Sequence, residues 1–322
     1  MMATQEENLF EFAAFDEKES ANLSLNTPAG ADRMNRNTVR CVRNNSLGDV
    51  MNEMNENINN MPQNIMNQIQ ALINNSIAPL QNQINQLQQT VDSLMSEASM
   101  STCGSITVTD YDGNVYQTVR IGNQCWMREN LRTTHYANGT EIAFSTNTST
   151  ITPYRYYPND DASNVITYGY LYNWPALMKG AASSEANPSG VQGICPDGWH
   201  VPSNAEWTQL ADFVGSQSQY QCNSSSTNIA KALASTTGWN SNNDDCTAGN
   251  TPSTNNTSGF SALPAGMHFG TPYNYGNAAY LWSATEENES YSYVHKLVYN
   301  RTSLSPDGTI KYCGCSVRCI RD

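Results

Sequence analysis

The segment from Asn57 to Val91 contains no charged side chain, yet apolar residues recur along it every three or four positions. The apolar stripe begins before this segment and continues beyond it: Leu47, Met51, Met54, Ile58, Met61, Ile65, Ile69, Leu72, Leu80, Ile84, Leu87, Val91 and Leu94. This spacing predicts amphipathic helices with a coiled-coil seam. A lone helix would leave that stripe in water, so we predict self-association, and the isoleucines in the seam favour a homotrimer over a dimer.

Two prolines lie inside the predicted helical region. Pro62 and Pro79 each lack a backbone donor and crowd the preceding turn, so we expect two or three helical segments separated by kinks or short breaks. The alternative is a single antiparallel hairpin that reverses direction at Pro79.

Composition divides the 322 residues into three regions. Residues 1–45 form an acidic attachment segment, residues 46–98 the coiled-coil stalk, and residues 103–322 a globular domain rich in Gly, Pro and aromatic residues. The net charge is −13 and no Lys/Arg cluster occurs, which argues against nucleic-acid binding. No run of eighteen apolar residues occurs, which argues against membrane insertion. The acidic N-terminus lacks the pattern of a secretory signal, so we expect exit by another route, such as release within a virus particle.

The C-terminal segment Gly259–Asp322 alternates apolar or Cys-anchored blocks with intervals rich in Tyr, Asn and Ser. Tyr offers large contact area and Asn and Ser offer adaptable hydrogen bonds, as in binding surfaces carried on a rigid frame. The alternative is an ordinary set of polar loops. Trp282, Trp199 and His200 are assigned to the core. The predicted ligand-contacting residues are His268, Phe269, Tyr273, Asn274, Tyr275, Asn277, Tyr280, Asn288, Tyr291, Tyr293, His295, Tyr299, Asn300, Arg301 and Tyr312.

Local signals predict three elements of the globular domain. Asp112-Gly113 followed by Asn114–Ile121 indicates a β-hairpin. Ser203 with Glu206 forms a capping box that begins a helix, and Thr227–Ser235 is a second helical candidate. In addition, Val39-Arg-Cys-Val-Arg43 echoes Val317-Arg-Cys-Ile-Arg321, and we interpret residues 20–44 as a remnant of a second copy of the last strands.

Eight of the nine cysteines follow residue 100, and no Cys-x-x-Cys pair occurs. With the four histidines scattered, a zinc site is not expected. Several disulfides are consistent with this count, but spacing leaves their connectivity open. The odd number leaves at least one thiol free or paired between chains.

Six motifs follow one another along the globular domain: Asp110-Tyr-Asp-Gly-Asn-Val-Tyr116, Ile121–Leu131, Tyr168-Gly-Tyr-Leu-Tyr-Asn-Trp174, Cys195–Ser203, Leu281-Trp-Ser-Ala-Thr285 and Ser316–Arg321. Taken in this order, they resemble the Fibrobacter succinogenes major paralogous domain. The resemblance implies an α+β, C-type-lectin-like fold with short antiparallel sheets, two short helices and long loops. It also implies three disulfides: Cys195 with Cys319, Cys103 with Cys125, and Cys222 with Cys246.

This family includes targets of diversity-generating retroelements, which randomise adenines in the C-terminal coding region. Asn and Tyr codons are rich in adenine, so the intervals above would be the variable positions. Cys313 and Cys315 each lie one adenine-to-guanine change from Tyr, and we interpret them as variable loop positions. The resemblance thus implies a diversifiable binding surface.

The favoured function is a receptor-binding phage tail fibre that attaches to a bacterial surface protein or glycan. Residues 1–45 would dock onto other virion or tail proteins. The alternative is an exported surface or pilus protein of a bacterial cell.

No catalytic activity and no cofactor are expected. Cys313-Gly-Cys315 resembles the cysteine pair of formylglycine-generating relatives, but no accompanying metal- or oxygen-binding set is evident. The acidic pairs Asp160-Asp161, Asp244-Asp245 and Glu286-Glu287 are interpreted as solvated loop residues, with a structural calcium ion at one of them as the alternative.

Overall fold

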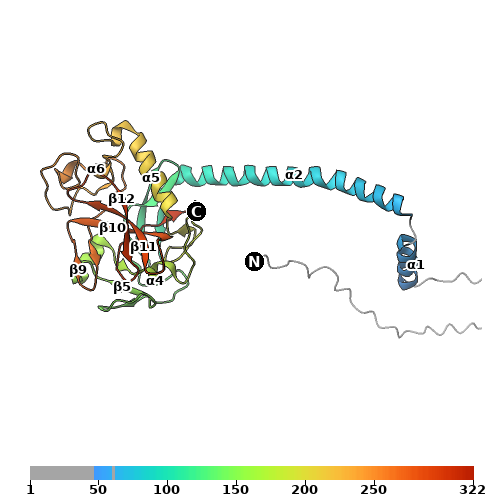
Figure 1. Cartoon of the computed structure of the whole chain (residues 1–322), viewed down its shortest axis with the longest axis horizontal. Helices are drawn as coiled ribbons and strands as arrows, with labels where there is room; N and C mark the ends of the chain where they lie inside the picture. The colour runs from blue at the N-terminus through green and yellow to red at the C-terminus, as the bar shows by residue number, and fades with distance from the viewer. Residues whose placement is uncertain (1–46, 60–61) are drawn as a thin grey trace, which may run out of the picture. The chain divides into compact units, whose positions relative to one another are not determined.

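The computed structural model describes residues 47–59 and 62–322 (Figure 1). The chain divides into two compact units, Met1–Ile77 and Ala78–Asp322. The predicted attachment segment 1–45 and the Val39–Arg43 echo, which includes Cys41, lie outside the described residues, as does Met61 of the apolar stripe.

Two helices form where the apolar stripe predicts them. Helix α1 spans Leu47–Asn59 and α2 spans Gln63–Thr102, so the first helix ends before Pro62 and the second begins directly after it. The chain thus has two helical segments, within the expected two or three, and no break occurs at Pro79, because α2 contains this proline in its interior. The alternative hairpin needs a helix to end at Pro79, and α2 does not end there.

The apolar stripe is exposed along both helices. The exposed side chains are Val50, Met51, Met54, Ile58, Ile65, Met66, Ile69, Leu72, Ile73, Ile77, Leu80, Ile84, Leu87, Val91 and Leu94. Other positions carry hydrogen bonds between residues four apart, from Gln63 to Asn67, Gln70 to Asn74, Gln81 to Asn85 and Gln88 to Asp92, at 2.9–3.2 Å. Each such pair stabilises a helix by about 0.2–0.5 kcal/mol. Uncharged amide side chains therefore support the polar side of α2.

A five-stranded antiparallel sheet joins the beginning and the end of the second unit. Its strand order is β1-β2-β3-β13-β7. The strands are β1 (Thr107–Thr109), β2 (Val115–Ile121), β3 (Gln124–Met127), β13 (Ile320–Arg321) and β7 (Trp199–His200). The predicted hairpin at Asp112-Gly113 is confirmed, since Thr109 pairs with Val115 across this turn.

A second antiparallel sheet divides the core into two clusters. It consists of β10 (Ala278–Glu286), β11 (Tyr291–Val298) and β12 (Ser305–Ile310). Tyr280 and Trp282 of β10 enter one cluster, whereas Leu281 enters the other. Eight of the nine residues of β10 are buried, because both faces of this strand are covered. Trp282 is 0% exposed, which confirms its assignment to the core.

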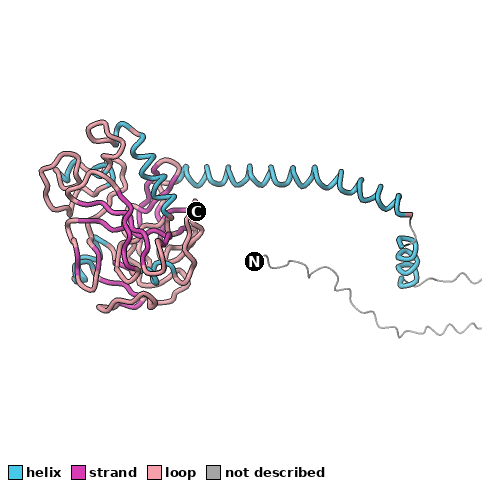
Figure 2. Tube along the Cα trace, in the orientation of Figure 1, coloured by secondary structure: helices cyan, strands magenta, loops and turns pink. Residues whose placement is uncertain are grey.

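The remaining elements are short, and loops connect most of them (Figure 2). Strands β4 (Ala143–Phe144), β5 (Tyr154–Tyr156) and β6 (Leu171–Tyr172) form a third sheet, and β8 (Met267–His268) pairs with β9 (Pro272–Tyr273). The short helical turns are η1 (Pro158–Asp160), η2 (Ala162–Asn164), α3 (Val165–Tyr168), α4 (Trp174–Met178), η3 (Ser218–Tyr220), α6 (Ala230–Leu233) and η4 (Pro252–Thr254). The unit is therefore a mixed α+β domain whose sheets are antiparallel except for the parallel β4–β5 pair.

Helix α5 (Asn204–Ser216) begins at the predicted capping box. The hydroxyl of Ser203 accepts from the Glu206 amide, and the Glu206 carboxylate accepts from the Ser203 amide. Trp207 of this helix packs at a tilt against Trp126 with ring centroids 4.6 Å apart, which anchors the helix in the second core cluster. The second helical candidate, Thr227–Ser235, contains only the one-turn helix α6.

Three disulfides cross-link the second unit. They join Cys103 to Cys125, Cys195 to Cys319, and Cys222 to Cys246, the three pairs that the resemblance implies. Cys313 and Cys315 are free thiols within the core, with 0% exposure. Their interpretation as variable loop positions therefore conflicts with their burial. Burial also raises the pKa of Cys313 to about 11, so its thiol stays protonated and unreactive at neutral pH.

The Arg318 side chain is fully buried beside this strand. Its guanidinium donates to the Asn130 side chain at 2.9 Å and to the carbonyls of Phe260 and Ser261, and it lies 4.6 Å from the Phe260 ring centroid. Burial lowers its pKa to about 9. This cation thus ties the final strand to two distant loops, which gives the Val-Arg-Cys motif a structural role. Within the described residues, no helix is both long enough and apolar enough to cross a membrane.

Candidate ligand-binding surface

The most exposed aromatic part of the predicted surface is the β8–β9 hairpin. Phe269 is 45% exposed and Tyr273 51% exposed. Gly266 precedes the hairpin with a φ of +67°, and a Cβ there would lie 2.4 Å from the Tyr273 carbonyl oxygen. The close return of the chain therefore requires glycine at this position. Tyr312 contacts Phe269, with ring centroids 5.6 Å apart, so a residue from beyond β12 joins the same surface.

The next two residues connect this hairpin to the interior and to a neighbouring loop. Asn274 donates from its side chain to the Tyr280 hydroxyl at 2.7 Å. Tyr275 donates to the Asn164 side chain at 3.0 Å and packs edge-on against Tyr168. The hairpin surface is defined here as Phe269, Tyr273, Asn274, Tyr275 and Tyr312. Its polar groups are partly held by the fold, which limits the entropy lost on binding.

The other predicted contacts occupy the two ends of the β10–β11 pair. Asn288 caps the turn before β11, where its side chain accepts from the Tyr291 amide at 3.0 Å, and Tyr293 follows on the same strand. At the far end, the Tyr299 amide donates to the Asn277 carbonyl at 2.8 Å, with Asn300 and Arg301 next in the chain. An eight-residue strand is about 26 Å long, so one small ligand does not contact both ends.

Three predicted contacts are wrong, because the structure buries their side chains. His268, Tyr280 and His295 are only 3–7% exposed. His268 stacks on Tyr156 at 4.1 Å between ring centroids, and its pKa is lowered by burial, although Asp160 opposes that shift.

His295 faces helix α5. It stacks on Trp207 at 5.1 Å, and its Nε2 lies 2.9 Å from the Asn204 side-chain oxygen. Burial lowers the pKa of His295 to about 3, so this imidazole is neutral. Tyr280 is also enclosed, and burial raises its pKa to about 12.

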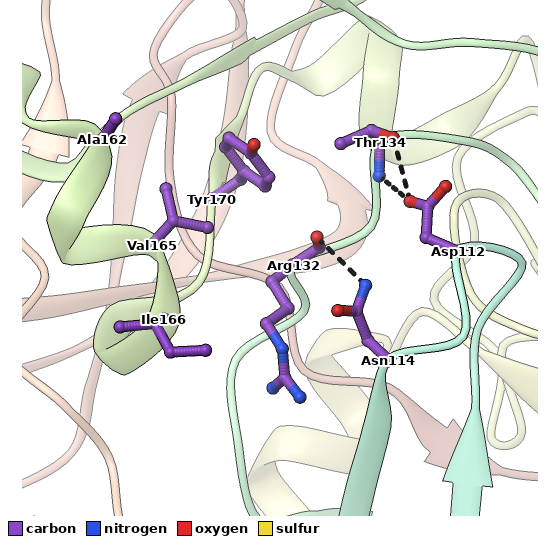
Figure 3. Close-up of a pocket in the computed structure, with 8 residues that line it drawn as sticks. All are labelled: Asp112, Asn114, Arg132, Thr134, Ala162, Val165, Ile166 and Tyr170. Atoms are coloured by element: carbon purple, nitrogen blue, oxygen red, sulfur yellow. Dashed lines mark hydrogen bonds between the residues drawn. The ribbon is translucent and has the colours of Figure 1, made fainter.

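Sequence reasoning missed a pocket that lies outside the C-terminal segment. Its volume is about 480 Å³, and it lies between the β1–β2 turn, the chain after β3 and helix α3 (Figure 3). The lining residues are Asp112, Asn114, Arg132, Thr134, Ala162, Val165, Ile166 and Tyr170. Two of the recognised motifs, Asp110–Tyr116 and Tyr168–Trp174, contribute to it, but no role was assigned to either motif.

Asp112 organises the rim of this pocket. Its carboxylate accepts from the Thr134 amide and from the hydroxyls of Thr133 and Thr134, at 3.1 and 3.0 Å, and lies 2.5 Å from Nδ1 of His135. Burial raises the pKa of Asp112, but these hydrogen bonds outweigh it and lower the pKa below its ordinary value. The carboxylate is therefore ionised at neutral pH, and its hydrogen bonds hold the loop of Thr133 and Thr134 at the rim.

The three acidic pairs lie on the protein surface. Asp160, Asp161, Asp244, Asp245, Glu286 and Glu287 are all exposed. Across the part of the chain that the structure describes, no group of three or more His, Cys, Asp or Glu side chains is arranged to hold a metal ion.

Comparison with known proteins places the second unit in a family. The model of the Fibrobacter succinogenes major domain matches residues 119–321, which is more than half of the chain. No curated protein and no solved structure matches. The matched range includes the Cys195–Cys319 bridge, the buried Arg318 and the hairpin surface. The chain is a member of the Fibrobacter succinogenes major domain family.

Proposed function

We propose that this protein is a trimeric adhesin that displays three copies of a C-type-lectin-like domain on a coiled-coil stalk. The observation that carries the proposal is the exposed apolar stripe of α1 and α2, which lacks charges from Asn57 to Val91. A stripe of this length needs a partner, and further copies of the same chain provide matching stripes. Ile58, Ile65, Ile69 and Ile84 place β-branched side chains in the seam, which favours three strands.

The hairpin surface is the proposed ligand contact. Phe269 and Tyr273 supply exposed aromatic area, and Asn274 and Tyr275 supply hydrogen-bonding groups already positioned by Tyr280 and Asn164. Amphipathic, pre-positioned side chains of this kind suit recognition of a bacterial surface protein or glycan. Three such surfaces on one trimer would raise the apparent affinity by about 10²–10⁴ without any new contact.

The proposed setting is a phage tail fibre, with residues 1–45 attached to other virion proteins. An exported bacterial surface or pilus protein is the second candidate, and the three disulfides favour an oxidising environment in either case. Neighbouring tail genes favour the phage, whereas neighbouring export or pilus genes favour the cell. A retroelement predicts a reverse transcriptase gene and a near-repeat of the 3′ coding segment nearby, and the absence of both would remove that part of the proposal.

Light scattering tests the stalk. The wild-type chain is expected at three times its monomer mass of 35.5 kDa. The double variant Ile84→Asp/Leu87→Asp places two charges in the seam and is expected at the monomer mass. The matched control Asn82→Asp/Gln89→Glu adds the same charge away from the seam and should remain trimeric. A monomeric wild-type protein would overturn the trimer.

Flow cytometry tests adhesion with labelled protein on whole cells of the strain that carries the gene and of its close relatives. Wild-type protein is expected to stain cells, and Phe269→Ser/Tyr273→Ser to lose that staining. Ile151, which is 86% exposed and lies outside the predicted surface, provides the control Ile151→Ser. Equal staining by all three proteins would exclude the hairpin surface, and no staining by the wild type would exclude adhesion to these cells.

A further inference from the structure

The pocket lined by Asp112 and Tyr170 has one polar side and one apolar side (Figure 3). Its volume of about 480 Å³ falls within the range of roughly 300–1,000 Å³ that small-molecule sites occupy. None of its lining residues belongs to Gly259–Asp322, so it is separate from the surface proposed above.

The polar side presents hydrogen-bonding groups that no described residue uses. The Asn114 amide nitrogen donates to the Asp110 carboxylate at 2.9 Å and to the Arg132 carbonyl at 3.4 Å. These bonds identify which end of the amide is the oxygen, and that oxygen accepts no hydrogen bond from the described residues. Asn114 therefore offers an acceptor to a molecule in the pocket.

Arg132 offers donors on the same side. Its Nη2 donates to the Val115 carbonyl at 3.0 Å, and its guanidinium lies 4.7 Å from the Tyr116 ring centroid, which fixes the side chain. Nε and Nη1 donate to no described residue. The Tyr170 hydroxyl, at the border between the two sides, likewise has no hydrogen-bond partner among the residues that the structure describes.

The apolar side consists of the turn η2, helix α3 and the Tyr170 ring. Ile166 is 77% exposed, and Val165 lies between it and Ala162 in Figure 3. The Tyr170 ring stacks on Tyr157 at 5.9 Å between centroids, and the Arg155 guanidinium lies 5.3 Å from the Tyr170 centroid. A fixed aromatic ring beside aliphatic side chains matches the C–H face of a sugar ring.

The charges of the pocket favour a neutral ligand. Arg132 is the cation of the lining and Asp112 the anion, and Asp112 is ionised at neutral pH because hydrogen bonds lower its pKa. A ligand carboxylate near Arg132 would be repelled by the ionised Asp112 and by the net charge of −13 on the chain. A hydroxyl avoids this conflict, because it both accepts from a guanidinium and donates to an amide oxygen.

We propose that this pocket binds a neutral hexopyranose unit, with its hydroxyls on Arg132 and Asn114 and its C–H face on Tyr170 and Ile166. The site would recognise a sugar residue of a surface glycan independently of the hairpin surface. If this sugar site is disproved, the adhesin proposal still stands, because none of the variants in the light-scattering and flow-cytometry tests alters the pocket.

Saturation-transfer NMR on the full chain tests the site with three probes: methyl β-D-glucopyranoside, methyl β-D-galactopyranoside and N-acetylneuraminic acid. At least one of the two neutral glycosides is expected to receive saturation, and titration of that glycoside gives its Kd. Arg132→Gln and Ile166→Glu should each weaken its binding about tenfold or more, since each removes one side of the contact.

Two matched controls alter the same residue types elsewhere. Arg120 and Ile151 are exposed outside the pocket, so Arg120→Gln and Ile151→Glu should leave the Kd unchanged. The four variants should retain the wild-type unfolding midpoint, because they alter partly or fully exposed side chains. No saturation of either neutral glycoside, binding of N-acetylneuraminic acid alone, or an unchanged Kd in both pocket variants would overturn the proposal.

Discussion

His200 is buried between two carboxylates. Its Nδ1 lies 2.6 Å from Asp322 and its Nε2 lies 2.7 Å from Glu206, the residue that also caps α5. The Glu206 carboxylate additionally accepts from the amides of Ser189 and Ser203. This cluster explains, in physical terms, the Trp199–Ser203 part of the family motif. It joins strand β7, the start of α5 and the last residue of the chain.

The His200 cluster predicts that stability depends on pH. Burial lowers the pKa of His200, but hydrogen bonds and charge interactions with Glu206 and Asp322 outweigh it and raise the pKa above the ordinary 6.5. The folded state therefore holds this proton more tightly than the unfolded state does. The resulting stability is complete below the unfolded pKa and is lost as pH rises through the folded pKa.

Urea unfolding of wild-type protein and His200→Gln, between about pH 6 and pH 9, measures this effect. The stability difference between the two proteins should be largest at the acidic end and shrink toward the alkaline end. A difference that stays constant or grows with pH would show that His200 acts through packing and not through its charge.

At the scale of the element, the polar and the apolar face of α2 both change their residue spacing at the same place. Four of its glutamines donate to the side chain four residues later, and these donors, Gln63, Gln70, Gln81 and Gln88, follow steps of seven, eleven and seven residues. The eleven-residue step covers the stretch near Ser76 and Ile77 where the apolar stripe also changes register. Such a stutter locally unwinds a coiled coil, and its presence on both faces indicates one helix with a shifted repeat.

Pro79 lies within this helix and is exposed. Proline costs about 3 kcal/mol relative to alanine inside a helix, because it removes one backbone hydrogen bond and crowds the turn before it. Pro79→Ala is therefore expected to raise the melting temperature of the helical circular-dichroism signal. Ala78→Gly, one position away, should lower it by comparison, since glycine costs about 1 kcal/mol. An unchanged or lower melting temperature for Pro79→Ala would mean that Pro79 makes a favourable contact that offsets its cost to the helix.

At the scale of the whole molecule, the disulfides differ in how much chain they enclose. Cys195 and Cys319 are 124 residues apart in sequence, whereas Cys222 and Cys246 are 24 apart. Loop-closure entropy predicts a stabilisation of about 5 kcal/mol for the first bridge and about 3.5 kcal/mol for the second. The longer bridge also fixes β13 between β3 and β7.

Urea unfolding of the two paired variants compares these bridges. Cys195→Ser/Cys319→Ser should lose more stability than Cys222→Ser/Cys246→Ser, by about 1.5 kcal/mol from loop length alone. Equal losses, or a larger loss for the shorter bridge, would show that native-state packing and not loop length governs their contribution.

The sequence by itself determined the features that depend on neighbours along the chain. The helices α1 and α2, the capping box of Ser203 and Glu206, and the turn at Asp112-Gly113 all follow from local spacing. Family membership also follows, because its motifs are contiguous. The three cysteine pairs came from that resemblance, since spacing alone allows other connectivities.

The tertiary structure alone decided which faces are covered. His295 and Tyr280 lie in a segment whose Tyr and Asn content is typical of a surface. However, α5 and the two core clusters enclose both sides of β10 and much of β11. The pocket also depends on tertiary structure, because folding brings Asn114 and Arg132 beside Ile166. Local patterns record the alternation of a strand, but the packing partner of each face comes from residues distant in sequence.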